Sequence, residues 1–159
     1  MDALEPSQST LASLVVPTVV LRHDLPGGKW HYDWMIQRPG GPDATLLSFR
    51  LEDRIDRLRW ADIIAESTPD HRAAYLTHEG QVAGDRGVVV RLARGEAIFR
   101  DASPDRLTID LAWPARPDAE QVPLRWQRVM GQPLGDGKWI LRVRELADSP
   151  TPGMSDDAL

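Results

Sequence analysis

Short apolar or alternating segments, each followed by glycine, proline or aspartate turn signals, constrain the fold of this chain more than any other feature. Many short strands at this spacing predict a sandwich or a barrel. The expected strands cover Leu14–His23, Trp30–Gln37, Ala44–Leu51, Arg86–Ala93, Glu96–Arg100, Arg106–Leu111, Val122–Met130 and Lys138–Leu146. The turn signals between them are Pro26-Gly27-Gly28, Pro39-Gly40-Gly41-Pro42, Gly84-Asp85, Arg94-Gly95, Ser103-Pro104-Asp105 and Gly135-Asp136-Gly137.

The last expected strand carries the clearest pattern, and one earlier segment is ambiguous. Asp136-Gly137 is a favourable hairpin turn, because both residues tolerate a positive φ. After that turn, Trp139, Leu141 and Val143 fall on one face of a strand, with lysine and arginine on the other. The segment Asp53–Glu66 fits a short helix followed by a strand.

The length of the chain, 159 residues, suits one domain with a sizeable core rather than two domains. Both ends are rich in serine, proline, aspartate and glycine, with little apolar surface to bury. We therefore expect a flexible N-terminal segment over 1–13, one folded domain over 14–146 and a flexible tail over 147–159.

Composition excludes several classes of site and partner. The chain has no cysteine, so disulfides and thiolate metal sites are excluded, and any metal must be held by His, Asp, Glu or backbone oxygen. The net charge of −5 argues against a protein that coats nucleic acid non-specifically, but not against an enzyme acting on one terminal phosphate. No apolar run reaches the ~18 residues of a membrane span, and we expect no membrane association and a cytoplasmic location.

Two histidines and an aspartate are placed to meet at one hairpin. Side chains two residues apart in a strand share a face, so His31 and Asp33 project together from the start of the second expected strand. His23 ends the first strand, and the short connector Asp24–Trp30 folds it back beside His31. Two imidazoles and a carboxylate predict a metal site with open positions, as a catalytic metal requires. The competing interpretation is a hydrogen-bonded surface pair of His31 and Asp33 without a metal.

A second polar cluster contains His71 and Tyr75, which are four residues apart and would share a face on one helical turn. A histidine beside a metal site can act as a general acid, and a tyrosine hydroxyl can donate to a phosphate oxygen. The alternative is that Asp70 caps a short turn and His71 is solvated.

Several motifs occur in an order that resembles the 3′-phosphoesterase domain of bacterial ATP-dependent DNA ligase D and its stand-alone relatives. The resemblance spans residues 18–146. Its motifs are Val19-Val20-Leu21-Arg22-His23-Asp24, Trp30-His31-Tyr32-Asp33-Trp34, Leu47-Ser48-Phe49, Asp70-His71-Arg72-Ala73-Ala74-Tyr75, Glu79-Gly80, Gly84-Asp85-Arg86-Gly87-Val88-Val89-Val90, Arg94-Gly95 and Lys138-Trp139-Ile140-Leu141-Arg142-Val143.

This resemblance implies a mainly β fold, a compact antiparallel β-barrel with one or two short helices or turns. It implies a divalent metal, Mn²⁺ first and Zn²⁺ or Co²⁺ as alternatives, at His23, His31 and Asp33, with the catalytic pair His71 and Tyr75 facing the substrate phosphate. The implied activity is removal of a 3′-terminal ribonucleoside and then a 3′-phosphate. The expected partners are a nucleic-acid 3′ end or a small phosphate ester and a repair ligase, with the protein itself a monomer. Asp24 and Glu79 are expected in supporting roles, such as holding a histidine tautomer.

The chain departs from the family at Met35, where the family has an arginine two residues after the metal-binding aspartate. A methionine cannot clamp a phosphate as a guanidinium does. Arg50, Arg86 and Arg91 are candidates to replace it. Two functional hypotheses follow: a metal-dependent phosphoesterase, and a non-catalytic module that binds a metal or an anion on the same barrel. A barrel with an unrelated function is a third.

Overall fold

A computed structural model describes residues 15–114, 124–147 and 149–150. The predicted flexible ends lie outside these residues, apart from 147, 149 and 150. The only helices in the described part are two 3-10 helices, η1 (Ile55–Arg57) and η2 (Ala73–Leu76), so the mainly β expectation is confirmed. The strands are β1 (Val15–Asp24), β2 (Trp30–Gln37), β3 (Leu46–Leu51), β4 (Trp60–His71), β5 (Gly80–Gln81), β6 (Val88–Ser103), β7 (Arg106–Pro114), β8 (Leu124–Gly135) and β9 (Lys138–Leu146).

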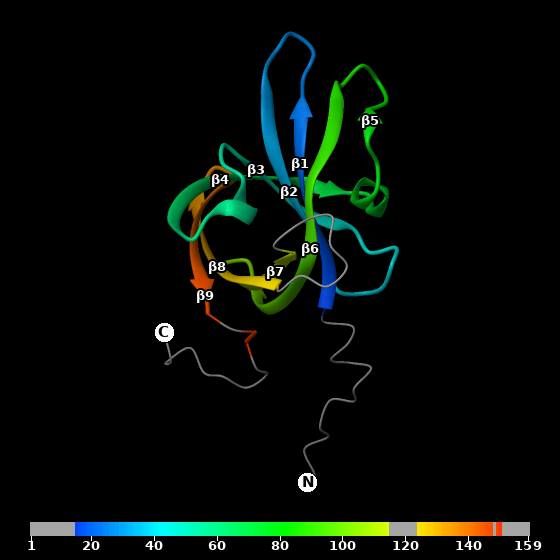
Figure 1. Ribbon diagram of the computed structural model, residues 1–159. Coiled ribbons are helices and arrows are strands. Elements are labelled where there is room, and N and C mark those ends of the chain that lie inside the picture. The colour runs from blue at the N-terminus through cyan, green and yellow to red at the C-terminus, as the bar shows by residue number, and fades with distance from the viewer. Residues whose placement is uncertain (1–14, 115–123, 148, 151–159) are drawn as a thin grey trace.

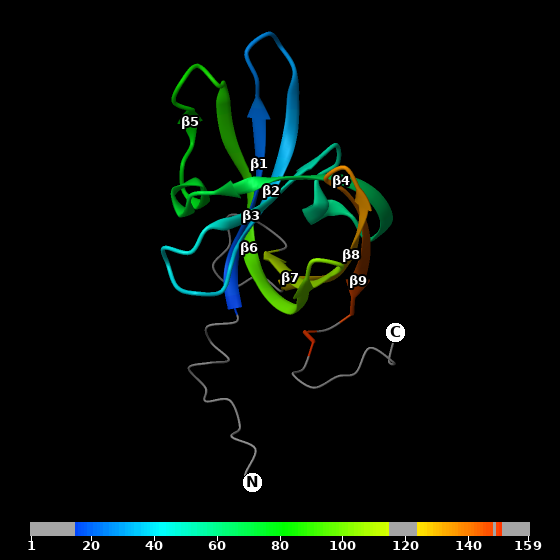
Figure 2. The same cartoon turned by 180° about the vertical axis from the view of Figure 1, so that it is seen from behind.

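The strands form one antiparallel sheet that closes on itself. Its order is β1-β2-β3-β4-β9-β8-β7-β6, and β6 pairs with β1 to complete a ring of eight strands. The sequence alone left a sandwich open; the structure has the barrel. In Figures 1 and 2, the β1–β2 hairpin and the start of β6 rise beyond the barrel, with the short strand β5 beside β6.

The barrel interior is filled by apolar side chains that alternate along each strand. On β2, Trp34 and Ile36 are fully buried, and the Trp34 ring stacks on Phe49 of β3 with ring centroids 5.7 Å apart. Leu141 and Val143 of β9 close the core as the alternation predicted. Burying side chains of this size contributes about 1.5–3 kcal/mol each.

The segment 88–103 is one long strand, whereas the sequence predicted two strands separated by a turn at Arg94-Gly95. Gly95 allows β6 to approach β7 closely and does not form a turn. A Cβ at this position would collide with the carbonyl oxygen of Ala112 on β7 and lie 2.7 Å from Trp113 Cε3. The glycine therefore marks the place where β6 and β7 pack tightly.

Two other local predictions are confirmed. Asp136 and Gly137 both have positive φ, 54° and 75°, and turn β8 into β9. The ambiguous segment after Asp53 forms η1 and then β4, although β4 continues to His71. Within the described residues, no helix has the length and apolar character needed to cross a membrane.

Candidate metal centre

The β1–β2 hairpin places two histidines and an aspartate on one face. In the antiparallel register His23 pairs with His31, and Leu21 pairs with Asp33. The turn between the strands is closed by a hydrogen bond from the Leu25 N–H to the Lys29 carbonyl oxygen, 2.7 Å long, and its two glycines have φ of 95° and 91°. Period-two alternation and a glycine turn are therefore enough to assemble the metal trio, by which we mean His23, His31 and Asp33.

The geometry of the metal trio fits one divalent ion. His31 Nε2 lies 3.2 Å from Asp33 Oδ1, and His23 Nδ1 lies 3.6 Å from Asp33 Oδ2. One ligand atom from each residue lies within 4.8 Å of the others. Ligands about 2.1 Å from a shared ion are separated by about 3–3.5 Å at tetrahedral or octahedral angles. The His31–Asp33 distance falls in this range, and the wider separations would have to close through side-chain shifts when an ion binds. The side chains of His23, His31 and Asp33 are 17%, 10% and 7% exposed, so most of their surface is shielded from solvent.

A backbone carbonyl fixes the tautomer of His23. Its Nε2 lies 2.6 Å from the carbonyl oxygen of Arg86, which can only accept, so Nε2 carries the hydrogen. Nδ1 then presents its lone pair toward Asp33, as a metal ligand must. The carbonyl is set by the next residue: Gly87 has a φ of 97°, and a Cβ there would collide with the carbonyl oxygen of Asp24.

Asp24 and Glu79, which were expected to orient a histidine, instead form hydrogen bonds with other groups. Asp24 accepts hydrogen bonds from the Arg22 guanidinium, at 3.1 and 3.2 Å. Glu79 Oε1 accepts from the backbone N–H of Arg91, at 2.9 Å. Nothing in the sequence points to the Arg86 carbonyl, because every residue has a backbone acceptor and only the fold determines which one meets His23.

His71 and Tyr75 lie together, but not on one helical turn. His71 is the last residue of β4, and Tyr75 belongs to η2. Their rings meet edge to face, with centroids 5.3 Å apart and planes at 88°. The predicted helical spacing was therefore wrong in detail, because the chain leaves a strand between the two residues.

The simpler interpretation of this cluster is also corrected. Asp70 does not cap η2; its carboxylate accepts from Arg38 Nε at 2.6 Å and from Thr45 Oγ1 at 2.8 Å. The hydrogen bond from Arg38 is the largest cause that holds the pKa of Asp70 below its usual value. His71 is only partly exposed, and its Nδ1 is buried and has no hydrogen-bond partner among the described residues.

An outer apolar cluster connects the two groups of polar residues. It consists of Val19, Leu21, Met35 and Leu46 on the face of β1, β2 and β3 that points away from the barrel core. Tyr75 and Leu76 pack against it. Because Leu21 is the cross-strand neighbour of Asp33, η2 lies close to the metal trio.

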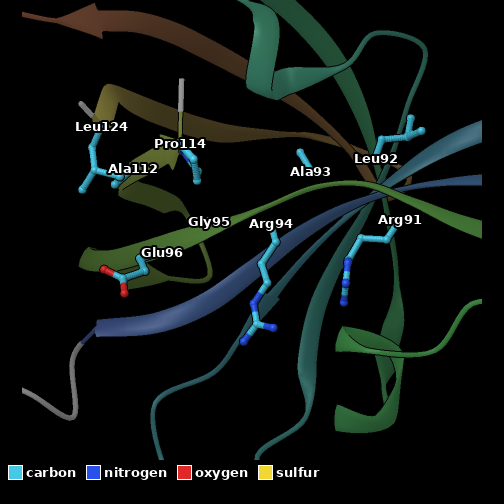
Figure 3. Close-up of a pocket in the computed structure, with 9 residues that line it drawn as sticks. All are labelled: Arg91, Leu92, Ala93, Arg94, Gly95, Glu96, Ala112, Pro114 and Leu124. Atoms are coloured by element: carbon cyan, nitrogen blue, oxygen red, sulfur yellow. The ribbon is translucent and has the colours of Figure 1, made fainter. Parts of the chain in front are cut away.

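Arg91 secures η2 from the side of β6. Its Nη1 donates to the carbonyl oxygen of Leu76, 3.1 Å away. Figure 3 shows the Arg91 and Arg94 side chains leaving β6 on the same side, around a hollow of about 570 Å³ that none of the metal trio lines. With Arg38–Asp70 at its other end, the segment that carries Tyr75 is held at both ends.

Neither a known family model nor a curated protein matches this chain, so the candidate centre is defined by its own geometry.

Proposed function

We propose that the protein is a metal-dependent phosphoesterase that removes a phosphate or a ribonucleoside from the 3′ end of DNA. The observation that carries the proposal is the metal trio, three side chains able to bind one ion, beside the His71–Tyr75 pair on the same face of the sheet. The order of motifs shared with the ligase D phosphoesterase domain supplies the substrate class. A monomer in the cytoplasm, working with a repair ligase, is part of the same proposal.

The roles of the residues follow from their chemistry. His23, His31 and Asp33 bind the ion, with Mn²⁺ expected and Zn²⁺ or Co²⁺ compatible with the same nitrogen and oxygen donors. An ion held by these residues would supply Lewis-acid polarisation of a phosphoryl oxygen and an activated water. His71 transfers a proton or stabilises developing charge, and the Tyr75 hydroxyl donates a hydrogen bond to the phosphate.

One observation favours the second candidate, a module that binds a metal or an anion without catalysis. Met35 is 2% exposed and packed in the outer apolar cluster, so its side chain makes no contact with a ligand at the surface. Position 35 therefore supplies no guanidinium to a phosphate, and a site without that cation loses part of the stabilisation of a phosphoryl transition state. Retained metal binding without turnover would identify this second candidate.

The proposal is tested with full-length protein loaded with Mn²⁺ and a DNA primer that ends in a 3′-phosphate. We expect phosphate release that falls at least 100-fold in His31→Ala, since losing a supporting partner of a metal ligand already costs about 10–100-fold. Asp105→Ala is the control, because Asp105 is exposed in the turn between β6 and β7 and belongs to neither the metal trio nor the His71–Tyr75 pair. No turnover on 3′-phosphate or 3′-ribonucleoside ends, with metal bound, would refute the proposed activity.

A further inference from the structure

Arg50 of β3 is the cation nearest in register to the metal trio. It pairs directly with Asp33 across the β2–β3 ladder, so the two side chains leave the sheet on the same face. Directly opposed residues of antiparallel strands have Cβ atoms about 4.5–5.5 Å apart. An arginine at this distance reaches over the carboxylate to the space in front of it.

Arg50 is free to bind, in contrast to the arginines around it. Arg22 is paired with Asp24, Arg38 with Asp70, and Arg91 donates to the Leu76 carbonyl oxygen. Arg50 is exposed and makes no hydrogen bond or ion pair with any residue in the described part of the chain. Asp33 does not hold it, because the two carboxylate oxygens face His31 and His23.

His31 and Arg50 line the same hollow, which opens where β3 and β4 separate beyond the Arg50–Glu66 pair and has a volume of about 500 Å³. Lys138 is the other cation of this hollow. Its remaining charges are acidic: Glu52, Asp53, Asp62 and Glu66. Glu66 pairs in register with Arg50, and Glu52 follows Leu51, the partner of Tyr32. The acids outnumber the cations, so a long polyanion along the hollow is repelled, and attraction of a small oxyanion depends on Arg50 together with a bound metal ion.

We propose that Arg50 is the anion-binding residue of this site and holds the free oxygens of a terminal phosphate whose other oxygen is bound by the metal. The planar guanidinium can donate two parallel hydrogen bonds to such a group. This inference rests on the proposed function. It adds a named residue to the site and a preference for a terminal phosphate monoester over an internal phosphate of a strand.

The test measures binding of inorganic phosphate to the Mn²⁺-loaded full chain, by ³¹P line broadening, and separately measures Mn²⁺ affinity by the electron paramagnetic resonance of free Mn²⁺. Arg50→Ala is expected to weaken phosphate about 10- to 100-fold, the range for hydrogen bonds to a charged group. Arg50→Lys keeps the positive charge but loses the paired hydrogen bonds of the guanidinium, so its phosphate affinity is expected to lie between those of wild type and Arg50→Ala. Mn²⁺ affinity is expected to stay equal or to rise, because a neighbouring positive charge is removed.

Arg94→Ala is the matched control. Arg94 is an exposed arginine that pairs in register with Val19, so it shares the face but lies two strands away from β2. The two variants change net charge equally, and a general electrostatic effect would weaken phosphate equally in both. Equal weakening would therefore overturn the assignment of Arg50.

The other outcomes separate this inference from the proposed function. A metal-loaded protein that binds no phosphate overturns the role of Arg50, as does an Arg50→Ala variant that loses Mn²⁺ together with phosphate while thermal unfolding stays unchanged. Failure of the wild-type protein to bind any divalent metal overturns both proposals. Hydrolysis that is unaffected by Arg50→Ala, with phosphate binding also unaffected, removes the inference and leaves the phosphoesterase standing.

Discussion

The two faces of β2 have different roles: one packs into the barrel core, and the other carries two residues of the metal trio. Toward the barrel, Trp34 and Ile36 are fully buried among side chains of the opposite strands. On the opposite face, His31 and Asp33 are followed by Met35. The 3-10 helix η2 covers the apolar part of this face. One face holds the strand in place by packing, and the other presents polar atoms that packing leaves free to bind. The difference means that substitutions on one strand separate stability from metal binding.

The largest expected effect is on the inner face. Trp34→Ala removes a fully buried ring that stacks on Phe49 and donates from Nε1 to Thr18 Oγ1 at 3.0 Å. We expect a loss of about 3–5 kcal/mol in the free energy of unfolding, measured in urea without metal. Trp60→Ala, at a tryptophan that is 71% exposed, should change it by no more than about 0.5 kcal/mol. Similar losses at both positions would contradict the division of faces.

The next effect is on the outer face and concerns metal affinity. Asp33→Asn keeps the shape of the side chain and removes its charge, so Mn²⁺ affinity is expected to fall by at least about 100-fold. Unfolding without metal should change by at most about 1 kcal/mol, because asparagine keeps the volume of the side chain and can still face both imidazoles. The wild-type protein should gain thermal stability on adding Mn²⁺ and the variant should not. A shift of the same size in both would show that the ion binds elsewhere.

The smallest effect concerns the tie that holds η2 over the outer face. The pKa of Asp70 is lowered by the hydrogen bond from Arg38, so the charged carboxylate stabilises the folded state. This contribution is full above the unfolded pKa of about 4 and is lost as the pH falls through the lower folded value. The pair is partly exposed, so Asp70→Asn should cost less than about 1 kcal/mol at pH 7.

The measurement for Asp70 is urea unfolding of wild type and variant at pH 7 and near pH 2. The difference between them should shrink toward the lower pH, because protonation of Asp70 removes the charge that distinguishes it from asparagine. Asp105→Asn, in the exposed turn between β6 and β7, should show no such difference at either pH. A difference that persists at low pH would assign the effect to shape and not to charge.

Local pattern was sufficient for the hairpin and for the metal trio. Alternation with a period of two and a short glycine turn determine which side chains of β1 and β2 meet, and both are visible in the sequence. The continuity of β6 through Gly95 was not visible in the sequence. A glycine that allows close packing and a glycine that makes a turn look alike until the neighbouring strand is placed. Arg50 was one of three candidate arginines until the β2–β3 register put it opposite Asp33.

The hydrogen bond from His23 to the Arg86 carbonyl has a consequence for how such a site is inherited. The group that orients the imidazole belongs to the path of the chain and not to any side chain. Sequence drift at position 86 leaves that acceptor in place, while the constraint falls on Gly87, whose positive φ and contact with Asp24 admit no side chain. A comparison of ligand residues alone would overlook the glycine on which the histidine depends.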